Sequence, residues 1–525
     1  FAMGVCRNKV SKSSSTLLES TFRNPPFSSG VYTWWHWMNG NITKDGITCD
    51  LEAMKANGIA GYQLFEAGSG IPIGPVESLS DEWVDLILHT LKESERLGLE
   101  FAMHNCPGWS SSGGPWITPD KAMQIITWSE TKVTGGKQIR MPLPTPKHMF
   151  DYYIDTFCLA IPANMEVIPK SSVLELSGQL KDGVLTWAAP AGEWLIIRFG
   201  QTAKDQKNKS APSKSTGLDC DKFSTEALDY HLDCMFKRLM PAMEKVAKHS
   251  KIGLLIDSYE TGDQDWTSDM PAYFEQKHRY ALYPFLPALA NKVVESEEST
   301  KRFLFDFRRT RADLFAERYY AHFQKRCKEK GIITYTEPYG GNMMEELQVA
   351  QQLDINMGEF WCGQTVLWAN YKYNRTVKQV ASIAHTLGGK IVGAEAFTSE
   401  PDADKWLLYP YALKSLGDYM FTRGLSRIYF HRFAHQPHPT AAPGMTMGAW
   451  GLHFDRTNTW WKPGKAWIDY LNRCQHIFQS STFYGDILYH NGDDSFGSTI
   501  EPEQTPLAPP EGYDYDMVNT EILDK

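Results

Sequence analysis

Short apolar segments alternate with longer amphipathic segments along most of this chain. In the stretch 251–260, Leu254, Leu255 and Ile256 form a continuous apolar run that ends at Asp257. A run of this length, with Gly253 inside it and a polar break after it, favours a strand buried on both faces. Similar segments predict eight strands, at 31–37, 61–66 and 100–105, within 251–260, and at 332–337, 354–360, 390–396 and 427–433.

Amphipathic segments with helix start and stop signals lie between these strands. Ile47, Leu51 and Met54 share one face of a helix predicted at 43–57, which Gly58 ends. Further helices are predicted at 81–97, 225–248, 302–330, 376–387 and 405–423. Because strands that alternate with helices form parallel sheets, eight of them predict an α/β fold, a (β/α)8 TIM barrel.

Three parts of the chain depart from this alternation. Residues 1–30 are rich in Ser, Lys and Pro and are predicted to form an irregular N-terminal lead-in. Residues 132–200 contain short alternating segments separated by turns, which predicts an inserted antiparallel β subdomain. The barrel then comprises 31–131 and 201–480. A strand-like segment followed by several prolines at 481–525 is expected to be the start of a further C-terminal domain that is truncated here.

Composition narrows the partners that the chain can have. The net charge of −9 and the lack of basic clusters argue against nucleic acid and anionic membranes. The 17 Trp, 24 Tyr and 26 Phe include several beside polar residues, a combination that suits stacking on sugars. We therefore expect a neutral carbohydrate substrate. The sequence leaves the oligomeric state open.

Targeting and redox signals are weak. No apolar run approaches the roughly 18 residues of a transmembrane segment, so none is expected. Residues 1–6 are similar to the tail of a secretory signal, which favours an extracytoplasmic location: periplasmic, cell-surface or secreted. The nine Cys show no metal-ligand spacing and are expected to be mostly buried free thiols.

Polar residues gather where the predicted strands end. In an α/β barrel the carboxyl ends of the strands carry the chemistry, so these residues are expected to share one face. They are Trp35, His36, Asn39, Glu66, His104, Asn105, Tyr259, Glu260, Glu337, Glu359, Glu395, His431 and His435, together with Trp109 in the Gly- and Ser-rich loop that follows the third strand.

Several carboxylates on one face suggest two kinds of chemistry. Glycoside hydrolysis needs one carboxylic acid to protonate the leaving oxygen and a second carboxylate to attack the sugar or to activate water. The same group of carboxylates could hold a hard cation such as calcium, which takes oxygen ligands. A structural ion-pair network is the alternative for any single Glu.

Five motifs resemble the catalytic region of glycoside hydrolase family 106, the α-L-rhamnosidases. They are 34–43 (WWHWMNGNIT), 104–110 (HNCPGWS), 257–260 (DSYE), 358–361 (GEFW) and 393–397 (GAEAF). The resemblance implies an exo-acting, inverting, calcium-dependent hydrolase. It also implies that Glu260 is the general acid, Glu395 the general base and Glu359 a ligand of Ca²⁺ or of the sugar. From their positions at the strand ends and in the loop after the third strand, we expect substrate to be bound by Trp35, His36, Asn39, His104, Asn105, Trp109, Tyr259, Glu337 and His431.

Two alternatives remain open at this point. A retaining barrel hydrolase of another sugar would use Glu395 as its nucleophile. A separation of about 5 to 5.5 Å between the two carboxyl groups would indicate retention, and about 6.5 to 9.5 Å inversion. A non-catalytic carbohydrate-binding barrel would use the aromatic residues without needing the acid pair.

Overall fold

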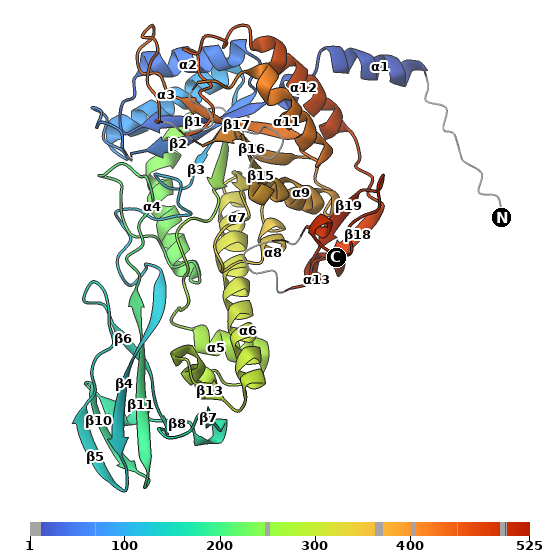
Figure 1. The fold of residues 1–525 in the computed structure, drawn as a ribbon. Helices are drawn as coiled ribbons and strands as arrows, with labels where there is room; N and C mark the ends of the chain where they lie inside the picture. The colour runs from blue at the N-terminus through green and yellow to red at the C-terminus, as the bar shows by residue number, and fades with distance from the viewer. Residues whose placement is uncertain are drawn as a thin grey trace, which may run out of the picture.

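The computed structural model describes residues 12–68, 70–246, 252–362, 371–400, 406–448, 450–493, 499 and 501–525, with the backbone alone for 12–17, 371–374 and 504. Eight parallel strands close into a barrel, which confirms the predicted fold (Figure 1). In spatial order they are β1 (Tyr32–Met38), β17 (Arg427–Ala434), β16 (Val392–Ser399), β15 (Ile355–Cys362), β14 (Ile333–Thr336), β12 (Ile252–Ile256), β3 (Glu100–His104) and β2 (Gly61–Ala67).

Helices surround this barrel, and local sequence signals define several of their ends. Thr43 caps α2 (Lys44–Ala56) by accepting a hydrogen bond from the Gly46 amide, and Gly98 ends α3 (Asp81–Leu97) in the left-handed conformation that glycine adopts readily. The predicted helix at 302–330 corresponds to α6 (Glu297–Leu314), a π-helical segment at Phe315–Ala321, and α7 (His322–Lys328). The main helices are α2 (Lys44–Ala56), α3 (Asp81–Leu97), α4 (Thr225–Met243), α5 (Met270–His278), α6 (Glu297–Leu314), α7 (His322–Lys328), α8 (Glu346–Ala350), α9 (Tyr371–Thr386), α11 (Pro410–Thr422) and α12 (Lys465–Ser480).

Alternation along the strands decides which side chains enter the barrel. Tyr32 and Trp34 of β1 pack with Leu255 and Tyr335 in a cluster of buried residues from several barrel strands. Trp35 belongs to the larger core between the barrel and its helices. Since successive side chains of a strand point to opposite faces, His36 lies on the inner face with Trp34.

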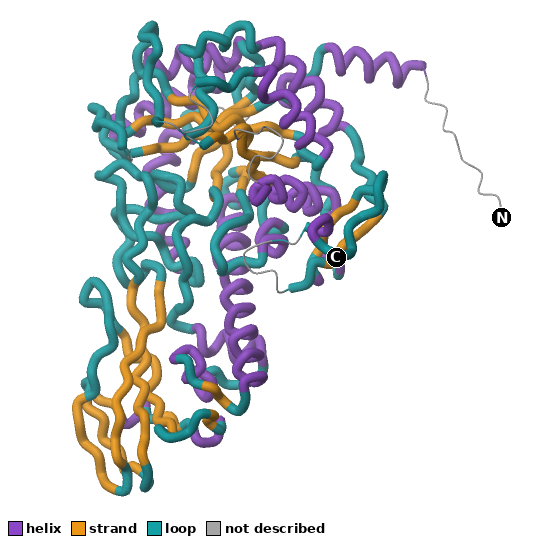
Figure 2. Tube along the Cα trace, viewed as in Figure 1, coloured by secondary structure: helices purple, strands orange, loops and turns teal. Residues whose placement is uncertain are grey.

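An antiparallel β subdomain stands away from the barrel (Figures 1 and 2). Its strands form two sheets in the orders β5-β10-β9 and β4-β11-β6-β8, with Leu185, Trp187 and Ile196 in the core between them. The subdomain contacts the α6 region where β7 (Val167–Ile168) pairs with β13 (Val293–Val294). The predicted segment 132–200 lies within these strands, which are β4 (Gln124–Thr134), β5 (Lys137–Pro142), β6 (Ile154–Pro162), β8 (Leu174–Glu175), β9 (Leu180–Lys181), β10 (Val184–Ala189) and β11 (Glu193–Ala203).

The two ends of the described chain carry more structure than was expected. The predicted irregular lead-in contains helix α1 (Lys12–Arg23), which an ion pair between Glu19 and Arg23 (2.9 Å), one turn apart, supports. Residues 1–6, with their signal-like pattern, lie outside the described residues. Near the other end, β18 (Ile487–His490) pairs with β19 (Tyr515–Val518), α13 (Thr520–Leu523) follows, and this unit packs on α8 and α9.

Two further expectations can be compared with the described residues. No helix among them is both long enough and apolar enough to cross a membrane. Each Cys among them is a free thiol, and most of these thiols are buried.

Candidate active site

A cavity of about 550 Å³ opens at the carboxyl ends of the barrel strands, where we expected the site. Its volume lies in the range of roughly 300 to 1,000 Å³ that is typical of ligand sites. The wall is formed by Trp34, His36, Ala67, Trp109, Ser210, Asp257, Ser258, Glu260, Glu359, Trp361, Glu395, Thr398, His431, Met447 and Trp450.

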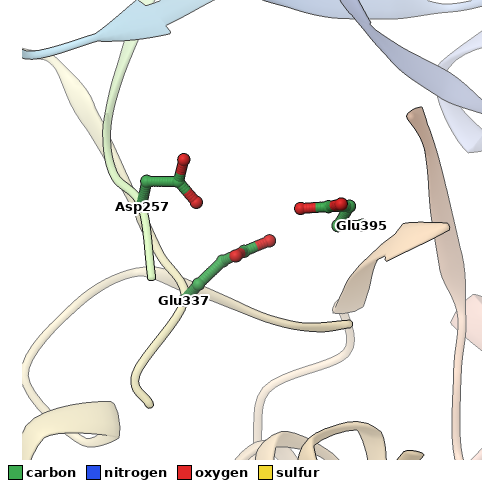
Figure 3. A group of neighbouring side chains, drawn as sticks. All are labelled: Asp257, Glu337 and Glu395. Carbon is green, nitrogen blue, oxygen red and sulfur yellow. The ribbon is translucent and has the colours of Figure 1, made fainter. Parts of the chain in front are cut away.

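Three buried carboxylates converge in and beneath this cavity, and we call them the carboxylate trio: Asp257, Glu337 and Glu395. They extend from the ends of β12 and β14 and from β16 toward a common point (Figure 3). One oxygen of each lies within 4.8 Å of the others. Tyr339 donates a hydrogen bond to Glu337 Oε2 (2.6 Å), and Glu337 Oε1 has no hydrogen-bond partner among the described residues. The trio therefore has an oxygen available for a ligand.

The environment disfavours three negative charges in the trio. Burial, followed by the charges of Asp257 and Glu395, raises the pKa of Glu337 well above its ordinary value. Burial and the neighbouring Glu359 and Asp257 do the same to the pKa of Glu395. Burial is also the main cause of the raised pKa of Asp257. A cation would relieve this repulsion, and three carboxylate oxygens are ligands that suit calcium.

Glu260 differs from the trio because its side chain is exposed at the cavity mouth. Trp109 donates its indole N–H to Glu260 Oε2 (3.2 Å). The loop carrying Trp109 depends on Gly108, whose φ is +84° and where a Cβ atom would lie 1.9 Å from the Lys209 carbonyl oxygen. Any larger residue at 108 would displace this loop, so the glycine keeps the indole beside Glu260.

Glu359 lies on the neighbouring side of the wall and outside the trio. It is the register partner of Glu395 on the adjacent strand, so the two side chains enter the cavity together. Trp361 donates its indole N–H to Glu359 Oε1. The structure thus places Glu395, and not Glu359, among the three converging carboxylates.

Three aromatic rings form the wall at β1 and β17, and we call them the ring cluster: Trp34, His36 and His431. Their centroids are 5.3 Å apart for Trp34 and His431, and 5.7 Å apart for His36 and His431. Trp34 Nε1, His36 Nδ1 and His431 Nδ1 have no hydrogen-bond partner among the described residues, although His431 Nδ1 lies 3.5 Å from Glu395 Oε1. Burial, with the charge of Arg432 adding to it, lowers the pKa of both histidines. The cluster is therefore neutral and has free nitrogen atoms.

Several residues predicted to bind substrate do not line the cavity. Trp35 faces the helices and donates its indole N–H to Asp50 Oδ2 (3.1 Å), because it alternates with the inward-facing Trp34. Glu66, which was expected only among the polar residues at the strand ends, faces outward in the same way and accepts a hydrogen bond from Ser78 (2.8 Å). Asn39 donates to the Ile71 carbonyl oxygen (2.6 Å) and so supports a neighbouring loop.

The other predicted residues outside the wall support it from behind. The Asp257 amide donates to His104 Nε2 (3.4 Å). Burial lowers the pKa of this imidazole to about 3, which agrees with a nitrogen that accepts a hydrogen bond. Asn105 donates to the Leu255 carbonyl oxygen (2.9 Å). The Tyr259 hydroxyl donates to the Gly262 carbonyl oxygen (2.6 Å) and holds the turn that carries Glu260. Glu337 belongs to the trio but is not part of the cavity wall.

Sequence reasoning missed Trp34, Trp361 and Trp450 as residues of the cavity wall. Alternation around His36 and Glu359 could have identified Trp34 and Trp361, because residues two apart on a strand share a face. No local pattern marks Trp450, which comes from the long loop after β17. Met447, from the same loop, lines the cavity as well.

This fold and cavity define a (β/α)8 barrel protein with a carboxylate-rich site at the face where such barrels carry their chemistry. The chain belongs to glycoside hydrolase family 106, since the family model described as alpha-L-rhamnosidase matches residues 23–156 and 147–525.

Two known proteins are similar to the chain. A Formosa agariphila protein named "Putative beta-glucuronidase" is 40% identical over 541 residues, covering 97% of this chain and 45% of the relative. The structure of a rhamnosidase from Novosphingobium sp. PP1Y matches with a TM-score of 0.88 at 25% identity, covering 96% of this chain and 64% of that one. The chain thus spans less than two thirds of the length of both proteins.

Proposed function

We propose that this barrel removes terminal α-L-rhamnose from oligo- or polysaccharides by hydrolysis. The observation that carries this proposal is the cavity in which an exposed carboxyl group, Glu260, faces a buried group of carboxylates. Glycoside hydrolysis requires two such groups in one site. Membership of the rhamnosidase family supports the choice of sugar.

Glu260 is the proposed general acid. Its exposed position at the mouth suits a group that protonates the oxygen of a leaving sugar, and the Trp109 indole fixes its orientation. Glu395 is the proposed general base, which removes a proton from the attacking water. Thr398 donates a hydrogen bond to Glu395 Oε1, and this contact fixes the carboxylate within the cavity. With a water between sugar and base, the reaction inverts the anomeric centre.

Calcium is the proposed metal, and the trio fits it. Asp257, Glu337 and Glu395 would hold the ion with one oxygen each, which leaves the second oxygen of Glu395 for the proton. A bound calcium supplies positive charge that orients sugar hydroxyl groups and offsets the charge of the trio. Glu359, the ligand expected from the sequence, would then contact sugar hydroxyls from the wall.

The ring cluster is proposed to bind the remaining hydroxyls of the sugar. Neutral imidazoles can donate and accept hydrogen bonds, and a buried nitrogen without a partner gains one when a hydroxyl arrives. His36, His431 and Trp34 supply three such nitrogens.

The name of the Formosa agariphila relative suggests a second candidate, a β-glucuronidase. Its sugar carries a carboxylate, which arginine or lysine usually binds in proteins. Among the described residues no Lys or Arg lines the cavity, and four carboxyl groups do. This charge distribution favours a neutral sugar such as rhamnose.

Turnover of aryl α-L-rhamnoside and aryl β-D-glucuronide by the chain tests the proposal. We expect release from the rhamnoside alone, and a loss of roughly 100-fold or more in kcat for Glu260→Gln and Glu395→Gln, the range for general acid–base groups. Parent-like rates in both variants would refute the mechanism. Proton NMR of the first anomer released distinguishes inversion from retention.

A further inference from the structure

The cavity has a closed polar end and an open aromatic end. Asp257, Glu395 and His431, at the closed end, are all less than 9% exposed. At the open end Trp450 is 49% exposed, and Glu260 is also exposed. We infer that Trp450 and Trp361 form a binding site for the pyranose ring on the leaving side of the scissile bond. This inference rests on the proposed function and adds a second sugar to it.

The backbone directly after Trp450 is anchored, and about half of the Trp450 side chain faces solvent. The amide of Gly451 donates to the Ser399 carbonyl oxygen (3.0 Å), and the amide of Leu452 donates to the His431 carbonyl oxygen (2.8 Å). These bonds tie the residues that follow Trp450 to the ends of β16 and β17. A large apolar ring that is anchored in a site and left exposed has the character of a ligand-contacting surface.

Trp361 supports this surface from below. Its ring meets that of Trp450 edge to face, with centroids 5.9 Å apart and an interplanar angle of 84°. Its indole N–H is used by Glu359, so its orientation is fixed by a second contact. Together with Met447, the two indoles give the mouth an apolar side. Such a side suits the C–H face of a sugar ring.

The position of Glu260 decides which sugar this is. A general acid lies next to the glycosidic oxygen, so the terminal sugar occupies the closed end and the next sugar lies on the outer side of Glu260. Trp450 and Trp361 line the same cavity, and the exposed Trp450 lies at its open end, where this next sugar emerges. Because Glu260 and Glu359 border it and no described Lys or Arg does, we expect a neutral sugar and not a uronic acid.

The test compares two neutral substrates that differ only beyond the scissile bond: rhamnosyl-α-linked glucose and methyl α-L-rhamnoside. For Trp450→Ala we expect kcat/KM for the disaccharide to fall roughly 10- to 30-fold, the loss typical of an aromatic anchor, with a clearly smaller loss for methyl rhamnoside. Trp450→Phe should retain most of the activity. Trp406→Ala is the matched control, because Trp406 is 62% exposed and stacks on His453 (3.8 Å) but does not line the cavity.

Two outcomes would overturn the inference: equal losses on both substrates, which indicate a damaged pocket, or no loss on either. A rhamnosyl uronic acid cleaved as fast as the neutral disaccharide would refute the preference for a neutral ring.

If the parent cleaves no rhamnoside, the proposed function fails. Quenching of tryptophan fluorescence by the neutral disaccharide that is clearly weaker in Trp450→Ala than in the parent and in Trp406→Ala would still support the sugar site. Quenching of equal size and affinity in all three proteins would refute it.

Discussion

Replacing Glu337 by glutamine should make the metal-free protein more stable. Two unit charges 4.8 Å apart repel by roughly 3.5 kcal/mol at an effective dielectric constant of about 20. If all three carboxylates were ionised, their mutual repulsion would be about 10 kcal/mol. Glu337→Gln removes two of the three pairwise repulsions, so the free energy of unfolding should rise by at most about 7 kcal/mol. Because burial raises the pKa of all three carboxyl groups, protons bound within the trio already relieve part of this repulsion, so the gain lies below this limit. Glutamine still accepts the hydrogen bond of Tyr339.

Calcium should narrow the difference in stability between the two proteins. In the parent, calcium at 100 times its Kd stabilises the fold by about 2.7 kcal/mol. Glu337→Gln, which lacks one carboxylate ligand, should show little or no response. Thermal unfolding of both proteins, first in chelator and then in excess calcium, gives the four Tm values to compare. Removing the metal from the parent should also abolish rhamnoside hydrolysis.

Glu66→Gln is the control for this experiment, because it removes a buried carboxylate of the barrel that lies outside the trio. It should keep the calcium response of the parent. The reasoning fails if Glu337→Gln lowers the Tm in chelator while the shift caused by calcium stays as large as in the parent. It also fails if chelator changes neither the Tm nor the activity of the parent.

Three further changes test other parts of the site. Burial raises the pKa of Glu66 from 4.5 to about 7, so the folded state holds its proton longer than the unfolded chain. Through this group, the free energy of unfolding should fall by roughly 3 kcal/mol as the pH rises from 4.5 to 7. In denaturant unfolding of Glu66→Gln, this part of the pH dependence should be missing. Trp34→Phe should lower kcat/KM roughly 10-fold at similar stability. Trp35→Phe should instead lower the free energy of unfolding by about 1 to 3 kcal/mol and keep kcat/KM. Equal kcat/KM values in the two variants would contradict the proposed role of the ring cluster in sugar binding. Gly108→Ala should fold but lose kcat as Trp109 moves from Glu260, and unchanged turnover would exclude that positioning role.

Local patterns in the sequence were sufficient to predict the barrel. Most buried strands are short apolar runs with a polar end, and several helices between strands have their own apolar face and cap, as Thr43 and Gly98 illustrate. Strand count and alternation then leave few folds to consider. The motifs around Glu260 and Glu395 likewise predicted the family, because they consist of contiguous residues.

Which side chains line the cavity was decided only by the closed barrel. A shift of one residue moves a strand's side chains to the other face, and this is why Trp35 was predicted in place of Trp34. Asp257, Glu337 and Glu395 are far apart in the sequence and meet only because β12, β14 and β16 curve around one centre. Trp450 reaches the mouth through a loop whose course depends on hydrogen bonds to the ends of β16 and β17. Contacts of this kind join distant segments, so they exist only in the folded protein.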